Sequence, residues 1–233
     1  MSNFKKRNNI KQYRVTGEAG SAPIEDLPKY REELQSLISQ YSLEDVYNAD
    51  ETALYWKLEP RKSLARGPVT GVKKPKDRIT IMLACNLTGT HKLPAVFIHK
   101  YKNPRCILNI DKKTLPVLYY WNNSAWMQRS IFRNWIMQLN QEMRRKRKYI
   151  LLLLDNVSTH RLDDNEQLSN VKLHFLPPNT TAHLQPLDQG IIYSFKVVIY
   201  SCCVMYNYIS ELTCSFFRLT IGNYSAKQNR CFR

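Results

Sequence analysis

The sequence lacks the patterns that mark three common classes of protein. Its six cysteines form no Cys-x-x-Cys pair, and no histidine spacing suits a zinc site. The N-terminus carries no secretory signal, so we expect reduced thiols and an intracellular protein. The most apolar stretch, residues 197–219, is interrupted by Asn207, Glu211 and Arg218 and does not reach the uninterrupted length of a membrane helix. These absences argue against a zinc module, a disulfide-stabilised secreted domain and a membrane protein.

Acidic residues are scarce relative to basic ones. There are 19 Asp and Glu against 35 Lys and Arg, which gives a formal net charge of +16 and a pI of about 9.6. Proteins this basic commonly bind nucleic acid or an anionic membrane surface. With 233 residues, 43% of them hydrophobic, the chain can form one sizeable domain with extensions or two small ones. It contains no internal repeat and no low-complexity tract, and a generically basic protein remains the alternative.

A short apolar run organises the centre of the chain. Residues 149–156 read YILLLLDN, which is typical of a strand buried on both faces, and Asp155 follows its carboxyl end. A second strand is expected at 171–176, followed by a Pro-rich turn and a helix from about Pro186 that carries Asp188. Open α/β sheets bind their ligands at the carboxyl ends of strands. We therefore expect the two acids to meet at one edge of a sheet.

The other elements are expected earlier in the chain. They are a helix at 27–41, a weak strand ending at Asp50, a strand at 79–89 with a hairpin partner at 93–100, a short strand at 117–120, and a helix at 124–146 with an apolar stripe of Ile131, Phe132, Trp135, Ile136, Leu139 and Met143. The order strand, hairpin, helix, strand, strand, helix is that of an RNase H-like core. The predicted fold class is α/β, with a mixed central sheet flanked by helices.

Three aspartates fall at the ends of these elements: Asp50, Asp155 and Asp188. Mg²⁺ and Mn²⁺ prefer oxygen ligands, which aspartate supplies from a short side chain. Two such ions about 3.5–4 Å apart stabilise both the attacking and the leaving oxygen of a phosphodiester. Three converging carboxylates are enough to hold two ions. From the pattern alone, each acid is as readily explained as a cap or turn residue.

Three blocks of sequence resemble a known family. NADET at 48–52, LLLLDNVSTH at 151–160 and LPPNTTAHLQPLDQGI at 176–191 are similar, in this order, to the signature blocks of the DDE superfamily endonucleases. The most similar branch contains the Tigger and pogo transposases and their domesticated relatives centromere protein B and jerky. That branch has Asp at the third catalytic position, where Asp188 stands in this chain.

The resemblance implies a site, a reaction and a partner. Asp50, Asp155 and Asp188 become catalytic ligands of Mg²⁺ or Mn²⁺, with two ions per site and no small-molecule cofactor. The implied reaction is hydrolytic cleavage of DNA at transposon ends and attack of the freed 3′-hydroxyl on target DNA. DNA is the implied partner, the nucleus the implied location, and a homo-oligomer on DNA is compatible with both. A non-catalytic DNA-binding protein like centromere protein B is the second reading, and a basic interaction module with the same fold is the third.

Three neighbours of the acids are candidates for a supporting role. Asn156 and His160 belong to the second block and are interpreted either as groups that position water or substrate, or as a turn cap and a packing residue beside it. Glu51 follows Asp50, and its side chain should point away from the first metal if the strand continues past Asp50.

Nine basic residues are candidate contacts to DNA phosphates. They are Lys73, Lys74, Lys76, Arg78, Arg144, Arg145, Lys146, Arg147 and Lys148. The first four belong to a basic loop and the other five end the predicted long helix. Cations at that position also stabilise the helix dipole, so a solvated helix end is the alternative.

The chain is predicted to have three parts. Residues 1–26 resemble the tail of a helix-turn-helix DNA-binding region followed by a linker, 27–196 form the DDE endonuclease domain, and 197–233 form an atypical tail rich in Cys and Tyr. The family continues instead with a basic helical stretch after this point. The sequence alone leaves open whether enzymatic activity survives in such a chain.

Overall fold

One six-stranded sheet forms the centre of the computed structural model, which describes residues 7, 25–55, 78–104, 107–163 and 165–205. The strands are β1 (Val46–Tyr55), β2 (Arg78–Asn86), β3 (Val96–His99), β4 (Leu118–Trp121), β5 (Ile150–Leu154) and β6 (Val171–Phe175). The helices are α2 (Leu27–Ile38), α3 (Arg129–Arg145), α4 (Thr181–Leu184) and α5 (Ile192–Met205), and the single turns are η3 (Lys112–Thr114), η4 (Ser158–His160) and η5 (Leu187–Ile191).

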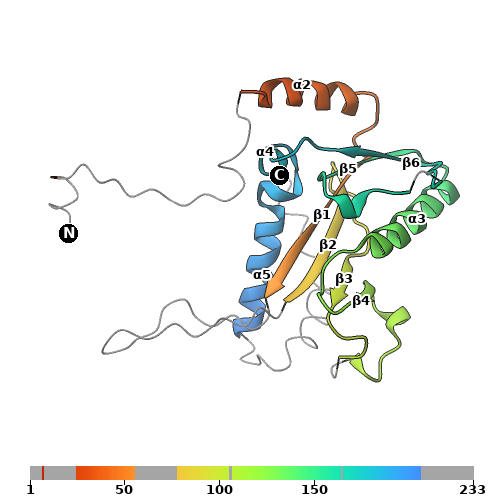
Figure 1. The fold of residues 1–233 in the computed structure, drawn as a ribbon, viewed down its shortest axis with the longest axis vertical. Helices are drawn as coiled ribbons and strands as arrows, with labels where there is room; N and C mark the ends of the chain where they lie inside the picture. The colour runs from red at the N-terminus through yellow and green to blue at the C-terminus, as the bar shows by residue number, and fades with distance from the viewer. Residues whose placement is uncertain (1–6, 8–24, 56–77, 105–106, 164, 206–233) are drawn as a thin grey trace.

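The sheet is mixed, with the strand order β4-β3-β2-β1-β5-β6 (Figure 1). β2 runs antiparallel to both of its neighbours, β1 and β3. On the other side of β1, β5 and then β6 continue the sheet in parallel, and β4 lies parallel to β3 at the opposite edge. A three-stranded antiparallel meander extended by parallel strands beside its first strand is the RNase H-like arrangement, so the predicted fold class is confirmed.

Helices cover both faces of the sheet (Figure 1). On one face, α3 buries its apolar stripe against alternate residues of β1, β2, β3 and β5. On the other face, α5 packs on β2 and β3 through Ile192, Phe195 and Ile199. α2 covers β1 and β5 on that same side, where Leu34 and Leu37 pack against the strands. The apolar run of β5 is completely buried because both of its faces are covered.

The first strand is longer than the sequence predicts. β1 does not end at Asp50 but continues to Tyr55, because β2 pairs with it along its whole length, from Tyr47 opposite Asn86 to Tyr55 opposite Arg78. Asp50 therefore lies in the middle of a strand. The partner that extends β1 lies more than twenty residues further along the chain, so the local pattern does not reveal it.

The long helix begins later than predicted, at Arg129 and not near Ser124. The side-chain oxygen of Asn122 accepts hydrogen bonds from the backbone amides of Ser124 and Trp126, and Ala125 has a positive φ of 51°. These contacts close a turn that precedes the helix. All six residues of the predicted apolar stripe are buried, so the helical face is confirmed.

The last helix is interrupted where it was predicted to be continuous. Asp188 lies in the turn η5, and the regular helix α5 begins only at Ile192. Gly190 has a φ of 108°, a left-handed conformation that glycine adopts without strain and that breaks the helix at this point. Among the described residues, no helix is long and apolar enough to span a membrane.

Replacement of Trp135 tests which face of α3 is buried. Its side chain is only 2% exposed and packs beside Phe132, with ring centroids 5.8 Å apart. We expect Trp135→Ala to lower the free energy of unfolding by about 3–5 kcal/mol, because it removes a large buried side chain and leaves a cavity. Met137→Ala on the exposed side of the same helix is the control, and chemical denaturation of both variants measures the difference. Equal stability of the two variants would contradict the assigned face.

Candidate functional site

Asp50 and Asp155 lie level with one another on adjacent chain segments. β1 and β5 pair in parallel with Asn48 opposite Leu153, and each acid follows two residues later. Side chains alternate along a strand, so both acids project from the same face of the sheet as Asn48 and Leu153. Asp155 directly follows β5, at the carboxyl end where the sequence predicts a site.

Asp188 completes the group from the turn η5. It is exposed, and its side chain hydrogen-bonds to that of Asp50. Burial, followed by the charges of Asp188, Glu51 and Asp155, raises the pKa of Asp50 to about 9. The charges of Asp188 and Asp155 contribute to the shift after burial, so these carboxylates lie close to that of Asp50. The structure thus brings together the three acids predicted from the sequence, and their role as metal ligands stays a prediction.

His160 lies between two carboxylates on the side of the sheet covered by α3. Its Nε2 lies 2.9 Å from Glu51 Oε1 and its Nδ1 lies 2.7 Å from Asp155 Oδ1. The contact to Asp155 is close but poorly aligned for a hydrogen bond, so it is mainly a charge interaction. The ring also packs against Phe132 of α3, with centroids 4.6 Å apart, and the histidine is 1% exposed.

The two carboxylates keep His160 protonated. Burial by itself lowers its pKa, but the contacts with Asp155 and Glu51 outweigh burial and raise the pKa to about 10. A protonated imidazole has two N–H donors and no lone pair for a metal. Glu51, Asp155 and His160 offer ligand atoms within 4.8 Å of one another, yet this charge state makes the histidine a counter-ion for the acids and not a metal ligand.

The other two supporting candidates differ in position. Glu51 points to the face opposite Asp50, as expected from the continuing strand, and reaches the site through His160. Asn156 is exposed, and its side-chain oxygen accepts a hydrogen bond from Arg161 at 3.2 Å. His160 packs inside the structure, so it has no access to a bound substrate, whereas Asn156 lies at the surface beside Asp155.

Two buried amides, Asn48 and Gln185, lie near the acids. Asn48 Nδ2 donates to the carbonyl of Leu153, and Asn48 Oδ1 accepts from the backbone amide of Leu187. Gln185 Nε2 donates to the carbonyl of Ala49. Asn48 and Gln185 are 1% and 0% exposed. A polar residue within a strand that is buried on both faces must find partners in the core, and this is the signal that singles out Asn48.

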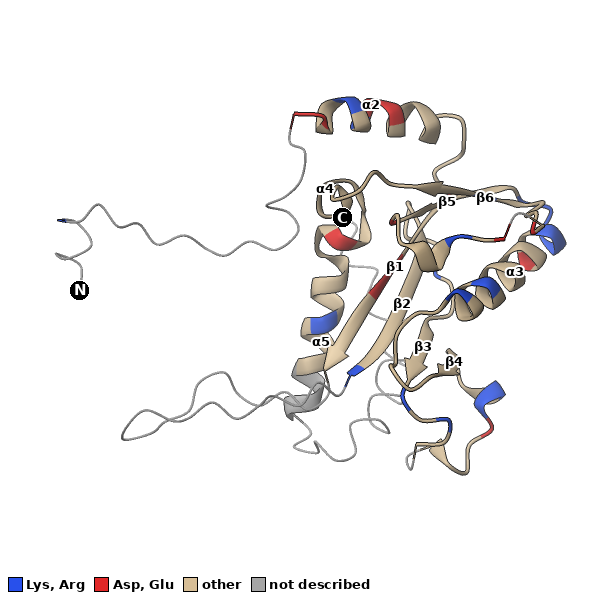
Figure 2. Cartoon of the chain, viewed as in Figure 1, with Lys and Arg blue, Asp and Glu red and all other residues tan. Residues whose placement is uncertain are grey.

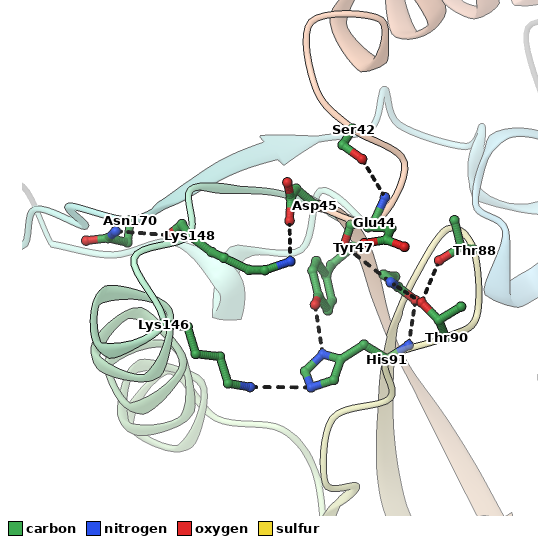
Figure 3. A network of polar contacts seen from close by, with 11 residues as sticks. Ser42, Glu44, Asp45, Tyr47, Thr88, Thr90, His91, Lys146, Lys148 and Asn170 are labelled. Atoms are coloured by element: carbon green, nitrogen blue, oxygen red, sulfur yellow. Dashed lines mark hydrogen bonds and ion pairs between the residues drawn. The ribbon is translucent and has the colours of Figure 1, made fainter.

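The basic run at the end of α3 lies away from the acids. Figure 2 shows basic residues along α3 and at its C-terminal end. Residues 144–148 precede β5, whereas Asp155 follows it, and five strand residues span about 16 Å. Lys148 is bonded to Asp45 at 3.0 Å (Figure 3), and Lys146 is bonded to Glu142 at 2.6 Å.

The remaining basic candidates fall into three groups. Arg144, Arg145 and Arg147 are exposed. Arg78 begins β2, where its guanidinium stacks 3.3 Å from the ring centroid of the exposed Trp126. Lys73, Lys74 and Lys76 lie outside the described residues. Among the described basic candidates, the structure therefore does not form one surface beside the acids.

The donor set fits a hard divalent cation. Asp50, Asp155 and Asp188 supply only carboxylate oxygens, which Mg²⁺ and Mn²⁺ prefer. The raised pKa of Asp50 indicates negative charge that the protein compensates only in part through His160. A cation among these oxygens would relieve their repulsion.

Comparison with known proteins shows the family. The family described as DDE superfamily endonuclease matches residues 76–211, more than half of the chain. The chain belongs to the DDE superfamily endonucleases. Asp155 and Asp188 lie inside the matched range, and Asp50 precedes it.

Several curated relatives of this DDE endonuclease chain align over most of its length. The human Jerky protein homolog is 33% identical over 199 residues, which are 81% of this chain and 35% of that protein. CENP-B homolog protein 2 of Schizosaccharomyces pombe is 32% identical, with 84% and 39% covered, and mouse Tigger transposable element-derived protein 4 is 31% identical, with 80% and 36% covered. The chain thus spans little more than a third of the length of these relatives.

Solved structures of the Mos1 transposase share the fold of this DDE endonuclease chain. A mariner Mos1 paired-end complex with Mg has a TM-score of 0.51 at 12% identity, with 99% of this chain and 68% of that chain covered. A Mos1 paired-end complex with the left transposon end has a TM-score of 0.50 at 13% identity, with 96% and 67% covered. At such identities the likeness concerns the fold alone.

The pKa of Asp50 predicts how stability depends on pH without metal. Its folded-state pKa of about 9 exceeds its ordinary value of 3.8, so the folded protein binds a proton that the unfolded chain has released. Stability should therefore fall as pH rises between these two values. Asp50→Asn removes the charge and should raise Tm at about pH 8 but not at about pH 4, by about 2–4 °C for each kcal/mol relieved.

Thermal melts in chelator at both pH values measure this effect. Asp163→Asn, at an exposed aspartate paired with Arg129, is the control and should change Tm little at either pH. An unchanged or lower Tm of Asp50→Asn at the higher pH would contradict the repulsion among the acids.

Proposed function

We propose that this chain contains the catalytic domain of a DNA endonuclease of the transposase type. In this proposal Asp50, Asp155 and Asp188 hold divalent cations, Mg²⁺ or Mn²⁺, with two ions per site. The substrate is duplex DNA, whose phosphodiester bond is hydrolysed and whose freed 3′-hydroxyl then attacks a second DNA. One observation carries the proposal: three carboxylates that repel one another lie together at the carboxyl end of β5.

The charges at the site support a metal-dependent reaction. Carboxylates alone repel a DNA phosphate, so the acids have no use for this substrate without an intervening cation. A bound divalent cation would supply the positive charge that activates the attacking oxygen and stabilises the leaving one. The protein contributes the positions of the oxygens: Asp50 from a strand, Asp155 from a strand end, and the exposed Asp188 from a turn.

His160 and Glu51 serve the site indirectly in this proposal. The imidazolium lies against Asp155 on the side away from solvent, so it orients that carboxylate and reduces the repulsion within the group. Glu51 accepts from the other ring nitrogen and holds the histidine in this orientation. Groups behind a ligand in this manner commonly tune metal affinity.

A non-catalytic DNA-binding role is the second candidate. It is favoured by the relatives named CENP-B homolog and Jerky protein, which align with this chain as well as the Tigger-derived protein does. Both candidates predict DNA binding, and only the first predicts cleavage. The conjunction of all three acids favours the catalytic candidate, because DNA binding alone gives no reason to gather like charges near a phosphate.

The wider assignments follow from the proposed substrate. The exposed Arg144, Arg145 and Arg147, together with Lys73, Lys74, Lys76 and the other basic candidates, are proposed to contact phosphates of a duplex longer than the site itself. The nucleus is the proposed location because the substrate is DNA. The division of the chain into 1–26, 27–196 and 197–233 also stays a proposal. Helix α5 crosses the proposed boundary between residues 196 and 197.

Replacing the acids tests catalysis. Asp155→Asn and Asp188→Asn should each abolish Mg²⁺-dependent nicking of supercoiled plasmid, because an amide is nearly isosteric with a carboxylate but is a poor ligand for a hard cation. Asp188 is exposed, so its variant should keep the fold with a Tm no lower than that of the wild type, whereas Asp155→Asn also loses the charge that faces His160. Asp163→Asn should nick like the wild type. Nicking that survives in both site variants would rule out the proposed active site.

DNA binding is expected to be weak and independent of sequence. Contacts to phosphates carry no base information, and each neutralised phosphate releases counterions. Affinity should therefore be similar for unrelated duplexes and fall steeply between low and moderately high salt. Binding titrations on several duplexes at two salt concentrations measure this, and a strong preference for one duplex that persists at high salt would contradict it.

A further inference from the structure

Among the described residues, the side chain of Asn48 is hydrogen-bonded so that it joins all three segments that carry the acids. It belongs to β1, two residues before Asp50. Its Nδ2 lies 3.1 Å from the carbonyl oxygen of Leu153, two residues before Asp155. Its Oδ1 lies 3.0 Å from the backbone nitrogen of Leu187, the residue before Asp188. One amide thus bonds to the backbone beside each of the other two acids.

The contacts of Asn48 require both halves of its amide. The N–H group satisfies a carbonyl of β5 and the oxygen satisfies a backbone amide of η5, so neither aspartate nor leucine reproduces the pair. The side chain is 1% exposed, and solvent does not offer replacement partners. Gln185, also buried, adds a second tie from the same turn region to β1 through the carbonyl of Ala49 at 3.2 Å.

These ties position the one acid that the sheet does not hold. The pairing of β1 with β5 sets the positions of Asp50 and Asp155. The turn that carries Asp188 is not part of the sheet and has no strand pairing to hold it. Neutral hydrogen bonds from Asn48, together with the buried side chain of Leu187, keep the turn in place without adding charge.

We propose that Asn48 is a positioning residue that sets the spacing of the three carboxylates, with Gln185 as a second tie. The proposal rests on the proposed function, in which these carboxylates hold a divalent cation. Asn48 lies behind the acids in the core, so it touches neither cation nor DNA. Its role is to align β1, β5 and η5 before the cation binds.

Asn86 provides a matched control for a purely structural role. It is 3% exposed and also uses both halves of its amide, donating to the Glu44 carbonyl at 3.3 Å and accepting from the His91 amide at 2.9 Å. Its partners belong to the β2–β3 connection and to the segment just before β1, where Figure 3 labels His91 and Glu44. Loss of Asn86 removes a similar set of buried hydrogen bonds without touching the segments that follow Leu153 or precede Asp188.

The experiment compares Asn48→Leu with Asn86→Leu in the full chain. NMR hydrogen exchange measures the backbone amides of Leu187 and His91 without metal, and a Mn²⁺ titration followed by electron paramagnetic resonance measures cation affinity. We expect Asn48→Leu to accelerate exchange at Leu187 by about tenfold or more, because its acceptor is lost. We also expect Mn²⁺ affinity to fall by about 10–100-fold, the usual effect of removing a group that orients ligands.

Asn86→Leu should show the opposite pattern. Exchange should accelerate at His91 and stay at the wild-type rate at Leu187, and Mn²⁺ should bind with wild-type affinity. Should Asn48→Leu fail to fold, Gln185→Met keeps a long unbranched side chain, removes only the tie to Ala49, and should shift both measurements in the same direction. Wild-type exchange at Leu187 and wild-type Mn²⁺ affinity in the Asn48 variant, or in the Gln185 variant used in its place, would overturn the proposal.

Failure of the proposed function gives a different result. A wild-type protein that binds no Mn²⁺, or binds it equally well as Asp155→Asn, contradicts the metal site and the catalytic proposal. The exchange at Leu187 still decides the positioning role in that case, because it reports on the contact between Asn48 and η5 without any cation.

Discussion

Repulsion among the carboxylates of Asp50, Asp155 and Asp188 is the constraint that the architecture around them has to oppose. Burial and these neighbours raise the pKa of Asp50 to about 9, so the site opposes the charged state on which metal binding depends. Packing in the surrounding core offsets the free-energy cost of holding the acids together. Parallel pairing of β1 with β5 holds two of the acids level, and the helices on both faces make that pairing rigid.

The compensating groups are arranged on two sides of the sheet. On the α3 side, His160 is a buried cation between Asp155 and Glu51, so Glu51 and its neighbour Asp50 serve the same site from opposite faces of β1. On the α5 side, the neutral amides of Asn48 and Gln185 tie the Asp188 turn to β1. A charge on one side and hydrogen bonds on the other oppose the same repulsion by different physical means.

Within the part of the chain that the structure describes, the basic run at the end of α3 lies away from this site. The basic end of α3 lies beyond the opposite end of β5, where Lys148 is paired with Asp45 (Figure 3) and Lys146 with Glu142. Cations at the C-terminal end of a helix stabilise its dipole whether or not DNA is bound. For these residues the net charge of +16 is therefore a poor guide to individual contacts, and the exposed arginines are the better candidates.

The sequence by itself determined the order of the elements, the buried face of α3 and the identity of the three acids. Each of these follows from a local pattern, which is an apolar run, a helical periodicity or a short motif. It also indicated that Glu51 would face away from Asp50. Only the tertiary structure decided that β1 continues to Tyr55, that Asp188 lies in a turn, and that Asn48 and His160 support the acids. Each of these depends on partners distant in sequence, whose hydrogen bonds and charges no local pattern contains.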